Sequence, residues 1–523
     1  MLAARAAHAP DATAFIAESR EISRAEFLGL CARAASWLTE QGVVPGDRVA
    51  IWMVNRLEWL ALFFATLKLG AILVPVNTRY RAEEVSYILK KSGASLLCLQ
   101  SGFRKIDFAD ILRRVDGGEL PRLKTLAVLD AVKPMDRILR RTTVELAIQD
   151  SVPDTREDTS DPEAPAIIFT TSGTTRGPKL VMHPQRTLRD HAERCVSAYQ
   201  LNAPGTVVLA MLPFCGVFGL NVVLAALAAG VPAVLVDAFD GPVVASLMNR
   251  YRVTHTYGSD EMVHRLAEAL PGHDPFPALR FFGFGAFNSS FGDSARQAWE
   301  RRIPLYGLYG SSEVLAIFAA QKAGLPVPEC IKGGGYPVAG RDASVRVRDI
   351  DTGRLLSPGE VGELEIRGPS NFIGYYQDAD ATARAVDGEG YFKTGDLGHL
   401  RADGSFVYQS RQGDVIRLGG FLVNPLEIEE AIKQIDGVAD AQVAAIDIQG
   451  TNRVVAFVIE RPRAGLSEAS LIDQIALRVA AFKVPARIAF VSRYPVTESS
   501  NGVKTQRAKL RDMARALVGE STH

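Results

Sequence analysis

Residues 166–179 read Ala-Ile-Ile-Phe-Thr-Thr-Ser-Gly-Thr-Thr-Arg-Gly-Pro-Lys, an apolar run followed by a turn rich in hydroxyls and glycines. The apolar residues 166–169 predict a buried strand. Glycine permits positive φ, and successive backbone N–H groups in such a turn can surround an anion. Lys179 adds a compact positive charge suited to phosphate. The stretch therefore predicts a nucleotide polyphosphate loop, although alone it also fits a flexible surface turn.

The loop differs from the P-loop of kinases and GTPases, which requires Gly-x-x-x-x-Gly-Lys-Ser/Thr. Here Gly173 and Gly177 stand four residues apart, and Leu180 occupies the Ser/Thr position. Pro178 also precedes the lysine directly. Any phosphate chemistry of this loop must therefore belong to a different class of nucleotide enzyme.

Length and composition indicate a multidomain globular protein. A chain of 523 residues exceeds what one hydrophobic core usually supports. Its 59 basic and 59 acidic residues cancel, so no net field attracts nucleic acid or an anionic membrane. The five cysteines are scattered, without a Cys-x-x-Cys pair or a zinc-like cluster. This pattern favours a reducing compartment, and we expect a cytoplasmic protein without a nucleic-acid partner.

One long uncharged segment raises the question of a membrane span. No charged residue occurs between Gly205 and Val236, a length that could cross a bilayer. Prolines and glycines divide the segment into shorter pieces. We expect a strand at 207–212, a helix at 220–229 and a strand at 233–236, all buried, and therefore no membrane span.

The order of the predicted elements indicates an α/β fold. Strands at 48–53, 72–76 and 95–99 alternate with helices at 57–69 and 82–91, which is typical of parallel sheets covered by helices. From Ala343 the strands become shorter, with strands expected at 344–348 and 362–367, and suggest an attached β module. An α+β unit, with a helix expected at 470–481, begins near Arg411, where Gly413, Gly419 and Gly420 suggest a hinge.

These patterns predict two domains. The first is a large N-terminal domain at residues 1–410, made of parallel sheets flanked by helices plus the β module. The second is a small mobile α+β C-terminal domain at residues 411–523, with a hinge near 411–414.

Five further motifs follow the Ser/Thr/Gly loop in a fixed order: Tyr309-Gly310-Ser311-Ser312-Glu313, Gly362–Gly368, Tyr391–Asp396, Ser410–Asp414 and Asn501–Arg507. Together they closely resemble the adenylate-forming enzymes, which include acyl- and aryl-CoA ligases, luciferases and peptide-synthetase adenylation domains. The resemblance covers essentially the whole chain. It implies an AMP-forming acid–thiol ligase that uses ATP, Mg²⁺ and coenzyme A. Such an enzyme joins a carboxylate to AMP, releases pyrophosphate and passes the acyl group to a thiol.

The resemblance also assigns roles to residues. Nucleotide binding would involve Thr171, Ser172, Gly173, Thr174, Thr175, Gly177 and Lys179 at the phosphates, Gly285, Ala286, Phe287 and Tyr309 at the adenine, Gly310, Ser311 and Ser312 near the α-phosphate, and Asp396 with Arg411 at the ribose. Catalysis would depend on Lys504, Glu313, Ser312 and Lys179. Glu313 would supply a carboxylate to Mg²⁺, and Arg417, Gly419 and Gly420 would flank coenzyme A.

The expected acid pocket is largely apolar. Its candidate lining residues are Phe214, Cys215, Phe218, Tyr257, Phe284, Leu308, Gly310 and Val314. Such a lining suits a medium-sized aryl or aliphatic carboxylic acid. Gly310 would leave room where acetate-specific relatives carry a tryptophan. Cys215 stands where the family often has histidine, and we interpret it as a small buried residue rather than a reactive thiol.

Several alternatives remain open at this point. The enzyme could be an acyl-AMP ligase that loads a separate carrier protein, a luciferase-like oxygenase, or a non-catalytic nucleotide-binding homologue. Glu313 and Asp396 could be solvated acids, and Lys504 could belong to a basic tail. Val503 separates Gly502 from Lys504 where the family usually has Gly-Lys, which suggests an extra loop residue. The sequence does not distinguish a monomer from a homodimer.

Overall fold

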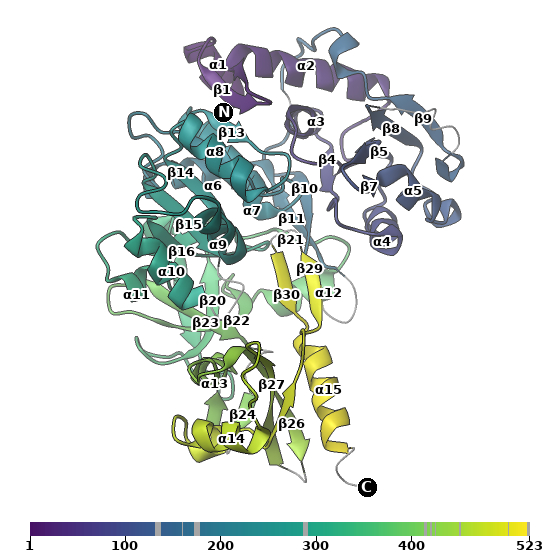
Figure 1. Cartoon of the computed structure of the whole chain (residues 1–523). Helices are drawn as coiled ribbons and strands as arrows, with labels where there is room; N and C mark the ends of the chain where they lie inside the picture. Colours follow the sequence, from purple (N-terminus) through teal and green to yellow (C-terminus); the bar gives the residue numbers. More distant parts are fainter. Residues whose placement is uncertain are drawn as a thin grey trace.

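The computed structural model describes residues 1–130, 138–158, 160–171, 178–285, 291–412, 416–418, 421–423, 425–448, 451–499 and 502–519. Two large sheets form the N-terminal part, and a smaller α+β unit lies at the opposite end of the molecule (Figure 1). This arrangement confirms the expected α/β fold class.

The first sheet has eight strands and a parallel centre. In spatial order they are β21 (Gly374–Tyr375), β11 (Leu180–Pro184), β10 (Pro165–Thr170), β4 (Ile72–Pro75), β3 (Arg48–Trp52), β5 (Leu96–Gln100), β8 (Thr125–Leu129) and β9 (Thr142–Glu145). The strands from β10 to β9 run parallel, whereas β11 and β21 are antiparallel additions at one edge. The predicted strand at 166–169 is the middle of β10, so the Ser/Thr/Gly stretch connects β10 to β11.

The second sheet has thirteen strands. They are β19 (Ser344–Arg348), β20 (Gly362–Arg367), β22 (Phe392–Leu400), β23 (Phe406–Arg411), β18 (Gly334–Pro337), β17 (Leu315–Ala320), β16 (Leu305–Ser311), β15 (Phe281–Gly285), β14 (His255–Ser259), β12 (Val208–Ala210), β13 (Ala233–Leu235), β1 (Thr13–Ala17) and β2 (Arg20–Ser23). Strands β16 to β1 are parallel. The expected β module is continuous with this sheet, because β17 folds back antiparallel onto β16 and carries the pairing onward.

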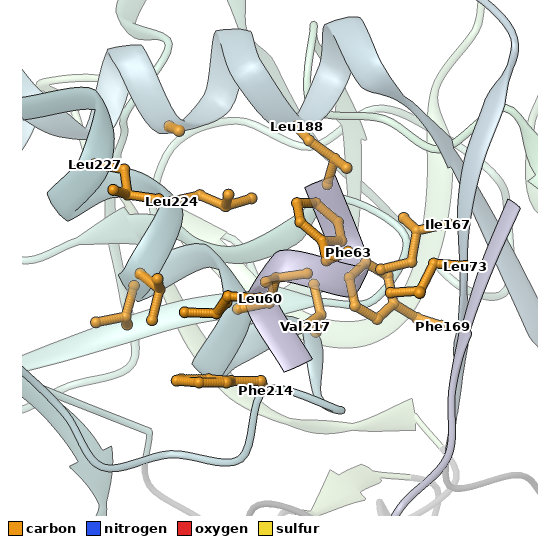
Figure 2. Close-up of a cluster of buried hydrophobic side chains, with 14 of the residues drawn as sticks. Leu60, Phe63, Leu73, Ile167, Phe169, Leu188, Phe214, Val217, Leu224 and Leu227 are labelled. Carbon is orange, nitrogen blue, oxygen red and sulfur yellow. The ribbon is translucent and has the colours of Figure 1, made fainter. Parts of the chain in front are cut away.

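Helices cover both faces of each sheet. One shared core contains residues of both sheets and of α2 (Arg24–Glu40), α3 (Leu57–Lys68), α6 (Gln185–Ala198) and α7 (Val217–Ala229). Figure 2 shows Leu60 and Phe63 of α3 beside Leu73 and Phe169 of the first sheet. The outer faces carry α4 (Ala82–Ser92) and α5 (Phe108–Arg113) on the first sheet, and α8 (Gly241–Arg250), α9 (Asp260–Ala269) and α10 (Phe291–Glu300) on the second.

The uncharged segment forms a buried helix rather than a membrane span. All but one of the thirteen residues of α7 are buried, which explains why this helix is apolar on every side. It ends at Gly230, whose φ of 70° is the left-handed conformation typical of a helix C-terminus. Arg5 and Arg24 donate to the carbonyls of Ala228 and Gly230 there. Within the described ranges, no helix combines the length and hydropathy that a membrane crossing requires.

The C-terminal unit has its own hydrophobic core, made only of residues between Leu418 and Ile488. Its elements are β24 (Ile416–Leu418), β25 (Phe421–Val423), α13 (Pro425–Lys433), β26 (Val438–Ile448), β27 (Thr451–Glu460), α14 (Glu468–Ala476), β28 (Arg487–Phe490), β29 (Val496–Ser499), β30 (Gly502–Thr505) and α15 (Arg507–Gly519). Short elements elsewhere are α1 (Leu2–His8), α11 (Val327–Cys330), α12 (Ala379–Ala385), β6 (Gly102–Phe103) and β7 (Ile106–Asp107).

Candidate active site

The turn between β16 and β17 carries Ser312 and Glu313, and the first residues of β17 that follow it have an unusual backbone. Leu315 and Ile317 adopt φ values of 62° and 58°. The left-handed region is unfavourable for a β-branched residue such as Ile317. Strain of this kind persists only where the surrounding structure enforces it, and it is concentrated at functional sites.

Three buried side chains hold the turn and the strained start of β17 in place. His183 Nε2 lies 2.7 Å from the Ser312 carbonyl oxygen, and His191 Nε2 lies 2.9 Å from that of Ala316. The hydroxyl of Tyr199 donates to the Ile317 carbonyl at 2.6 Å. Because a carbonyl oxygen only accepts, Nε2 of each histidine must carry the proton. Burial lowers the pKa of both imidazoles to about 4, so they are neutral at physiological pH.

The neutral state of His191 gives a testable pH dependence. Burial lowers its pKa from 6.5 to about 4, opposed by the Ala316 carbonyl and reinforced by Arg194. As the pH falls below 6.5, the unfolded chain binds this proton first, so stability declines between pH 6.5 and pH 4. When the pH is lowered from 7 to 5, we expect the free energy of unfolding of the wild type to fall by about 2 kcal/mol more than that of His191→Gln. Urea unfolding at both pH values measures this difference, and equal losses would contradict the assignment.

Glu313 and Lys179 lie on either side of one tyrosine. The Tyr375 hydroxyl donates to Glu313 Oε1 at 3.0 Å, and Lys179 Nζ donates to the Tyr375 oxygen at 3.4 Å. The backbone N–H of Phe372 also donates to the Glu313 carbonyl at 2.7 Å. Lys179 itself closes the Ser/Thr/Gly stretch, because its carbonyl accepts from the N–H of Thr171 at 3.0 Å.

Asp396 forms a second charged group with residues from two neighbouring elements. Tyr309 donates its hydroxyl to Asp396 Oδ2 at 2.6 Å, and Arg411 Nε lies 2.9 Å from Oδ1. Asp396 and Arg411 face each other directly across the β22–β23 ladder. Gly395 precedes Asp396 with a φ of 68°, a left-handed conformation that glycine adopts without strain. Asp396 is buried, which makes it a fixed acceptor.

The two groups are electrostatically connected. Asp396 is the largest cause that raises the pKa of Arg411, and Glu313 contributes in the same direction. Burial, followed by Glu313, raises the pKa of Tyr375, and Arg411 opposes this shift. Five of the predicted site residues therefore form one cluster: Lys179, Tyr309, Glu313, Asp396 and Arg411. The cluster lies at the edge of the first sheet and at the β16–β17 and β22–β23 regions of the second.

The other predicted nucleotide residues are placed less completely. Gly310 and Ser311 lie at the end of β16, and Gly285 ends β15. Ser172, Gly173, Thr174, Thr175 and Gly177, as well as Ala286, Phe287, Gly413, Gly419 and Gly420, lie outside the described residues.

The C-terminal candidates are located by their strands. Arg417 lies in β24, opposite Leu422 of β25. Lys504 lies in β30, opposite Thr497 of β29. Residues 502–505 form a hairpin strand, and the connection before it, where the sequence suggested an extra residue, lies outside the described residues. The hairpin extends from the C-terminal unit toward the N-terminal part (Figure 1).

Most of the proposed acid-pocket residues are buried in the shared core. The shared core contains Phe214, Phe218, Tyr257, Leu308 and Val314, each less than a tenth exposed. The Tyr257 hydroxyl is buried and has no hydrogen-bond partner among the described residues. Cys215 is buried, and burial raises its pKa to about 11, which supports its interpretation as an unreactive thiol.

Phe284 does not belong with this group. Phe284 and Phe282 both pack in the core on the outer face of the second sheet. Phe281, the residue before Phe282, packs against the shared core instead. Successive residues of a strand point to opposite faces, so Phe284 lies across the sheet from Tyr257. The prediction that Phe284 lines the acid pocket was therefore wrong, because this residue lies one position along the strand from a residue on the pocket face.

Gly310 also needs a different explanation. A Cβ atom at Gly310 would lie 2.7 Å from Ala316 Cα and 2.9 Å from the Leu315 carbonyl oxygen. The glycine is therefore required by the close approach of β17, and it does not by itself report the size of the acid pocket.

This close approach predicts a stability effect. Gly310→Ala should destabilise the fold by about 1–3 kcal/mol, because the contacts are with backbone atoms that cannot rotate away. Gly388→Ala is a matched control, since a Cβ there meets nothing within 4 Å. Thermal unfolding of both variants measures the difference. Equal unfolding temperatures would show that β17 can shift to accept the methyl group.

The described residues suit a metal that arrives with the nucleotide. None of their His, Cys, Asp and Glu side chains form a group of three or more that could hold an ion. Mg²⁺ usually binds through one or two carboxylates together with substrate phosphates and waters. Glu313, partly exposed at the turn and close to Lys179 through Tyr375, fits the role of such a carboxylate.

Sequence reasoning missed Tyr375, His183 and His191. Tyr375 lies 62 residues beyond Glu313, and no local pattern connects the two. The two histidines contact backbone carbonyls, which have no sequence signal of their own. Only the three-dimensional pairing of β11 with β21 and of α6 with the β16–β17 turn reveals these residues.

Comparison with known proteins shows the family to which the chain belongs. Family models for the AMP-binding enzyme and the AMP-binding enzyme C-terminal domain match residues 2–376 and 427–501. The chain is 31% identical to 4-coumarate–CoA ligase 2 of Oryza sativa subsp. japonica, over 97% of this chain and 91% of that protein. It is 29% identical to a medium-chain fatty-acid–CoA ligase of Escherichia coli, over 92% and 84%.

A solved structure shows the same fold. ATP-bound MatB from Rhodopseudomonas palustris superposes with a TM-score of 0.83 at 24% identity, covering 97% of this chain and 96% of that chain. The family model alone covers far more than half of the sequence, and it ends at the residue after Tyr375. By these matches and by its site, the chain belongs to the AMP-binding enzyme family.

Proposed function

We propose that this protein is an ATP-dependent carboxylic acid–CoA ligase that forms an acyl-adenylate, releases pyrophosphate and then forms an acyl-CoA. The observation that carries the proposal is the convergence of Lys179, Glu313, Asp396 and Arg411 in one cluster. Adenylation requires a cation that binds phosphate, a carboxylate that binds a metal ion and a buried acid that binds the ribose.

In the first step, an oxygen of the acid attacks the α-phosphorus of ATP, and pyrophosphate leaves. The reactants are both anionic, so positioning and charge neutralisation should provide most of the rate enhancement. Lys179 would bind the departing phosphates, and Ser312 would donate to the α-phosphate. When bound to Glu313, Mg²⁺ would offset negative charge on the phosphates.

Asp396 would accept hydrogen bonds from the two ribose hydroxyls. Its position is fixed by Tyr309 and Arg411, so little reorganisation is needed when the nucleotide binds. Tyr309 already contacts Phe406 and Tyr408, with ring centroids 5.2 Å and 5.9 Å away. The adenine would extend from this aromatic group along the end of β15.

The second step transfers the acyl group from AMP to the thiol of coenzyme A. We propose that residues 411–523 form a mobile domain with a hinge near 411–414, separate from the domain at 1–410. The self-contained core of the C-terminal unit supports this division. Arg417 in β24 would lie near coenzyme A, and Lys504 in β30 would approach the α-phosphate in the first step.

The acid is proposed to be a medium-sized aryl or aliphatic one. The apolar and aromatic residues Phe214, Phe218, Tyr257, Leu308 and Val314 support this class. The relatives described above are named as ligases of 4-coumarate and of medium-chain fatty acids. The buried state of all five cysteines also fits the cytoplasmic location we propose.

A substrate screen tests the proposed function. Purified protein, ATP and Mg²⁺ are incubated with benzoates, cinnamates or fatty acids of short to medium length, with and without coenzyme A. We expect pyrophosphate release with a subset of these acids and a CoA thioester detected by mass spectrometry. Acyl-hydroxamate without any CoA thioester would indicate a carrier-loading ligase. An absence of pyrophosphate with every acid would indicate a non-catalytic homologue.

A further inference from the structure

Tyr375 lies between two groups of opposite charge that the proposed reaction uses separately. Its hydroxyl donates to Glu313 at 3.0 Å and accepts from Lys179 at 3.4 Å. The lysine ammonium also lies 4.4 Å from the centroid of the Tyr375 ring, within the range of a cation–π contact. One tyrosine therefore supplies a hydrogen-bond partner to each charged group.

The position of Tyr375 is fixed by its own surroundings. It faces Val181 in the β11–β21 ladder, two residues after Lys179. Its backbone N–H donates to the Thr382 hydroxyl at 2.9 Å, and its ring lies 4.9 Å from that of Phe372. The side chain is buried, which keeps the phenol protonated and able to donate. Tyr375 is therefore held independently of the two charges it contacts.

The arrangement has a consequence for nucleotide binding. Lysine and glutamate that both reach one hydroxyl are close enough to pair directly if that hydroxyl is removed. A direct ion pair would occupy both groups at once, and a polyphosphate would have to break it. With Tyr375 between them, Lys179 can exchange a neutral acceptor, the tyrosine hydroxyl, for a phosphate oxygen at smaller cost than breaking an ion pair. Glu313 meanwhile keeps a neutral donor instead of a cation.

We propose that Tyr375 is a positioning residue that keeps Lys179 and Glu313 apart and ready for ATP. This inference depends on the proposed function only in requiring that the protein binds ATP. The hydroxyl takes no part in bond formation. Its effect should appear in nucleotide affinity and should depend on the negative charge of Glu313.

The first test compares Tyr375→Phe with the wild type by calorimetric titration of ATP, in EDTA and again with Mg²⁺. Phenylalanine keeps the ring packed on Phe372 and removes only the hydroxyl. We expect ATP to bind about tenfold more weakly, equivalent to about 1.4 kcal/mol. Tyr376→Phe is the matched control, because among the described residues the Tyr376 hydroxyl forms a hydrogen bond with exposed Gln377 alone, from which it accepts at 3.4 Å. This variant should stay within about twofold of the wild type.

The second test repeats both titrations in a Glu313→Gln background. A neutral amide cannot form the competing ion pair, so Tyr375→Phe should now change ATP affinity by less than about twofold. The same tenfold loss in both backgrounds would show a purely structural role and overturn the proposal. An unchanged affinity of Tyr375→Phe in the native background would overturn it as well.

These outcomes separate the inference from the proposed function. If the wild-type protein binds no ATP, the proposed function fails and this inference fails with it. If the wild type binds ATP and forms a CoA thioester but Tyr375→Phe binds equally well, only the inference fails. For the fully folded variant we expect kcat for adenylation within about threefold of the wild type, because both charged groups are engaged once ATP is bound.

Discussion

Replacing Lys504 by alanine is expected to slow acyl-adenylate formation by about 10²–10³, the loss typical of one preorganised donor in an active site. The lysine would bridge the α-phosphate and the incoming carboxylate, where two anions must meet. Thioester formation from a supplied acyl-adenylate should proceed at nearly the wild-type rate, because that step no longer contains the bridge. Single-turnover measurements of the two half-reactions provide the comparison.

The control for this experiment is Lys509→Ala. Lys509 is exposed at the beginning of α15 and should be dispensable for both half-reactions. If Lys504→Ala slows the two half-reactions equally, the lysine has a general role in stability or domain contact. Loss of activity in Lys509→Ala as well would indicate that net positive charge matters rather than position.

The anchoring of the hairpin supports the assignment of Lys504. Arg507 follows it by three residues, and its Nη1 lies 2.9 Å from Oε1 of the fully buried Glu429. The same carboxylate oxygen accepts from the N–H of Val443 at 3.0 Å. A buried carboxylate paired in this way fixes the base of the hairpin to the C-terminal core. The strand that carries Lys504 is therefore fixed to the C-terminal unit.

The regular elements could be predicted because each has a local cause. The limits of the predicted strands at 344–348 and 362–367 coincide with β19 and β20. The helix predicted at 57–69 is α3, one residue shorter. In contrast, α14 begins at Glu468 because Ser467 caps it, and it ends at Ala476 rather than at Ala481. The predicted end was wrong because apolar periodicity continued beyond the true end of the helix.

Long-range pairing was the part that the sequence did not reveal. The sequence indicated an attached β module but not the way it is attached, which is that β17 joins it to the parallel strands of the second sheet. Motif order named Glu313, Asp396 and Arg411 as nucleotide-site residues, a role that stays a prediction. It could not locate Tyr375, His183 or His191, because their contacts cross 62 to 129 residues and involve hydroxyl and backbone groups. Motifs name the groups that touch substrate, whereas the groups that position them depend on the folded chain.

Asp396→Asn is expected to lower kcat/KM for ATP by roughly 10²-fold. A hydrogen bond to a charged acceptor contributes about 1.5–3 kcal/mol, and a carboxylate can accept from both ribose hydroxyls where an amide has one acceptor oxygen. Folding should be affected little. The Arg411 side chain is 55% exposed, so water can solvate it when its carboxylate partner is removed. Steady-state kinetics with varied ATP, together with thermal unfolding, measure both effects.

A surface ion pair provides the matched control. Asp342 lies 2.8 Å from Arg194 with 64% of its side chain exposed, so Asp342→Asn removes the same charge from an aspartate–arginine pair outside the site. We expect this variant to keep wild-type kinetics. If both variants lost kcat/KM for ATP equally, net charge would explain the result. If Asp396→Asn instead lost more than about 4 °C of thermal stability while its kcat/KM for ATP stayed normal, the buried carboxylate would serve the fold and not the ribose. If Asp396 binds the ribose, Asp396→Asn should lose activity and keep its thermal stability. Tyr309 and Arg411 already hold the Asp396 side chain in position, so the carboxylate is available to the nucleotide.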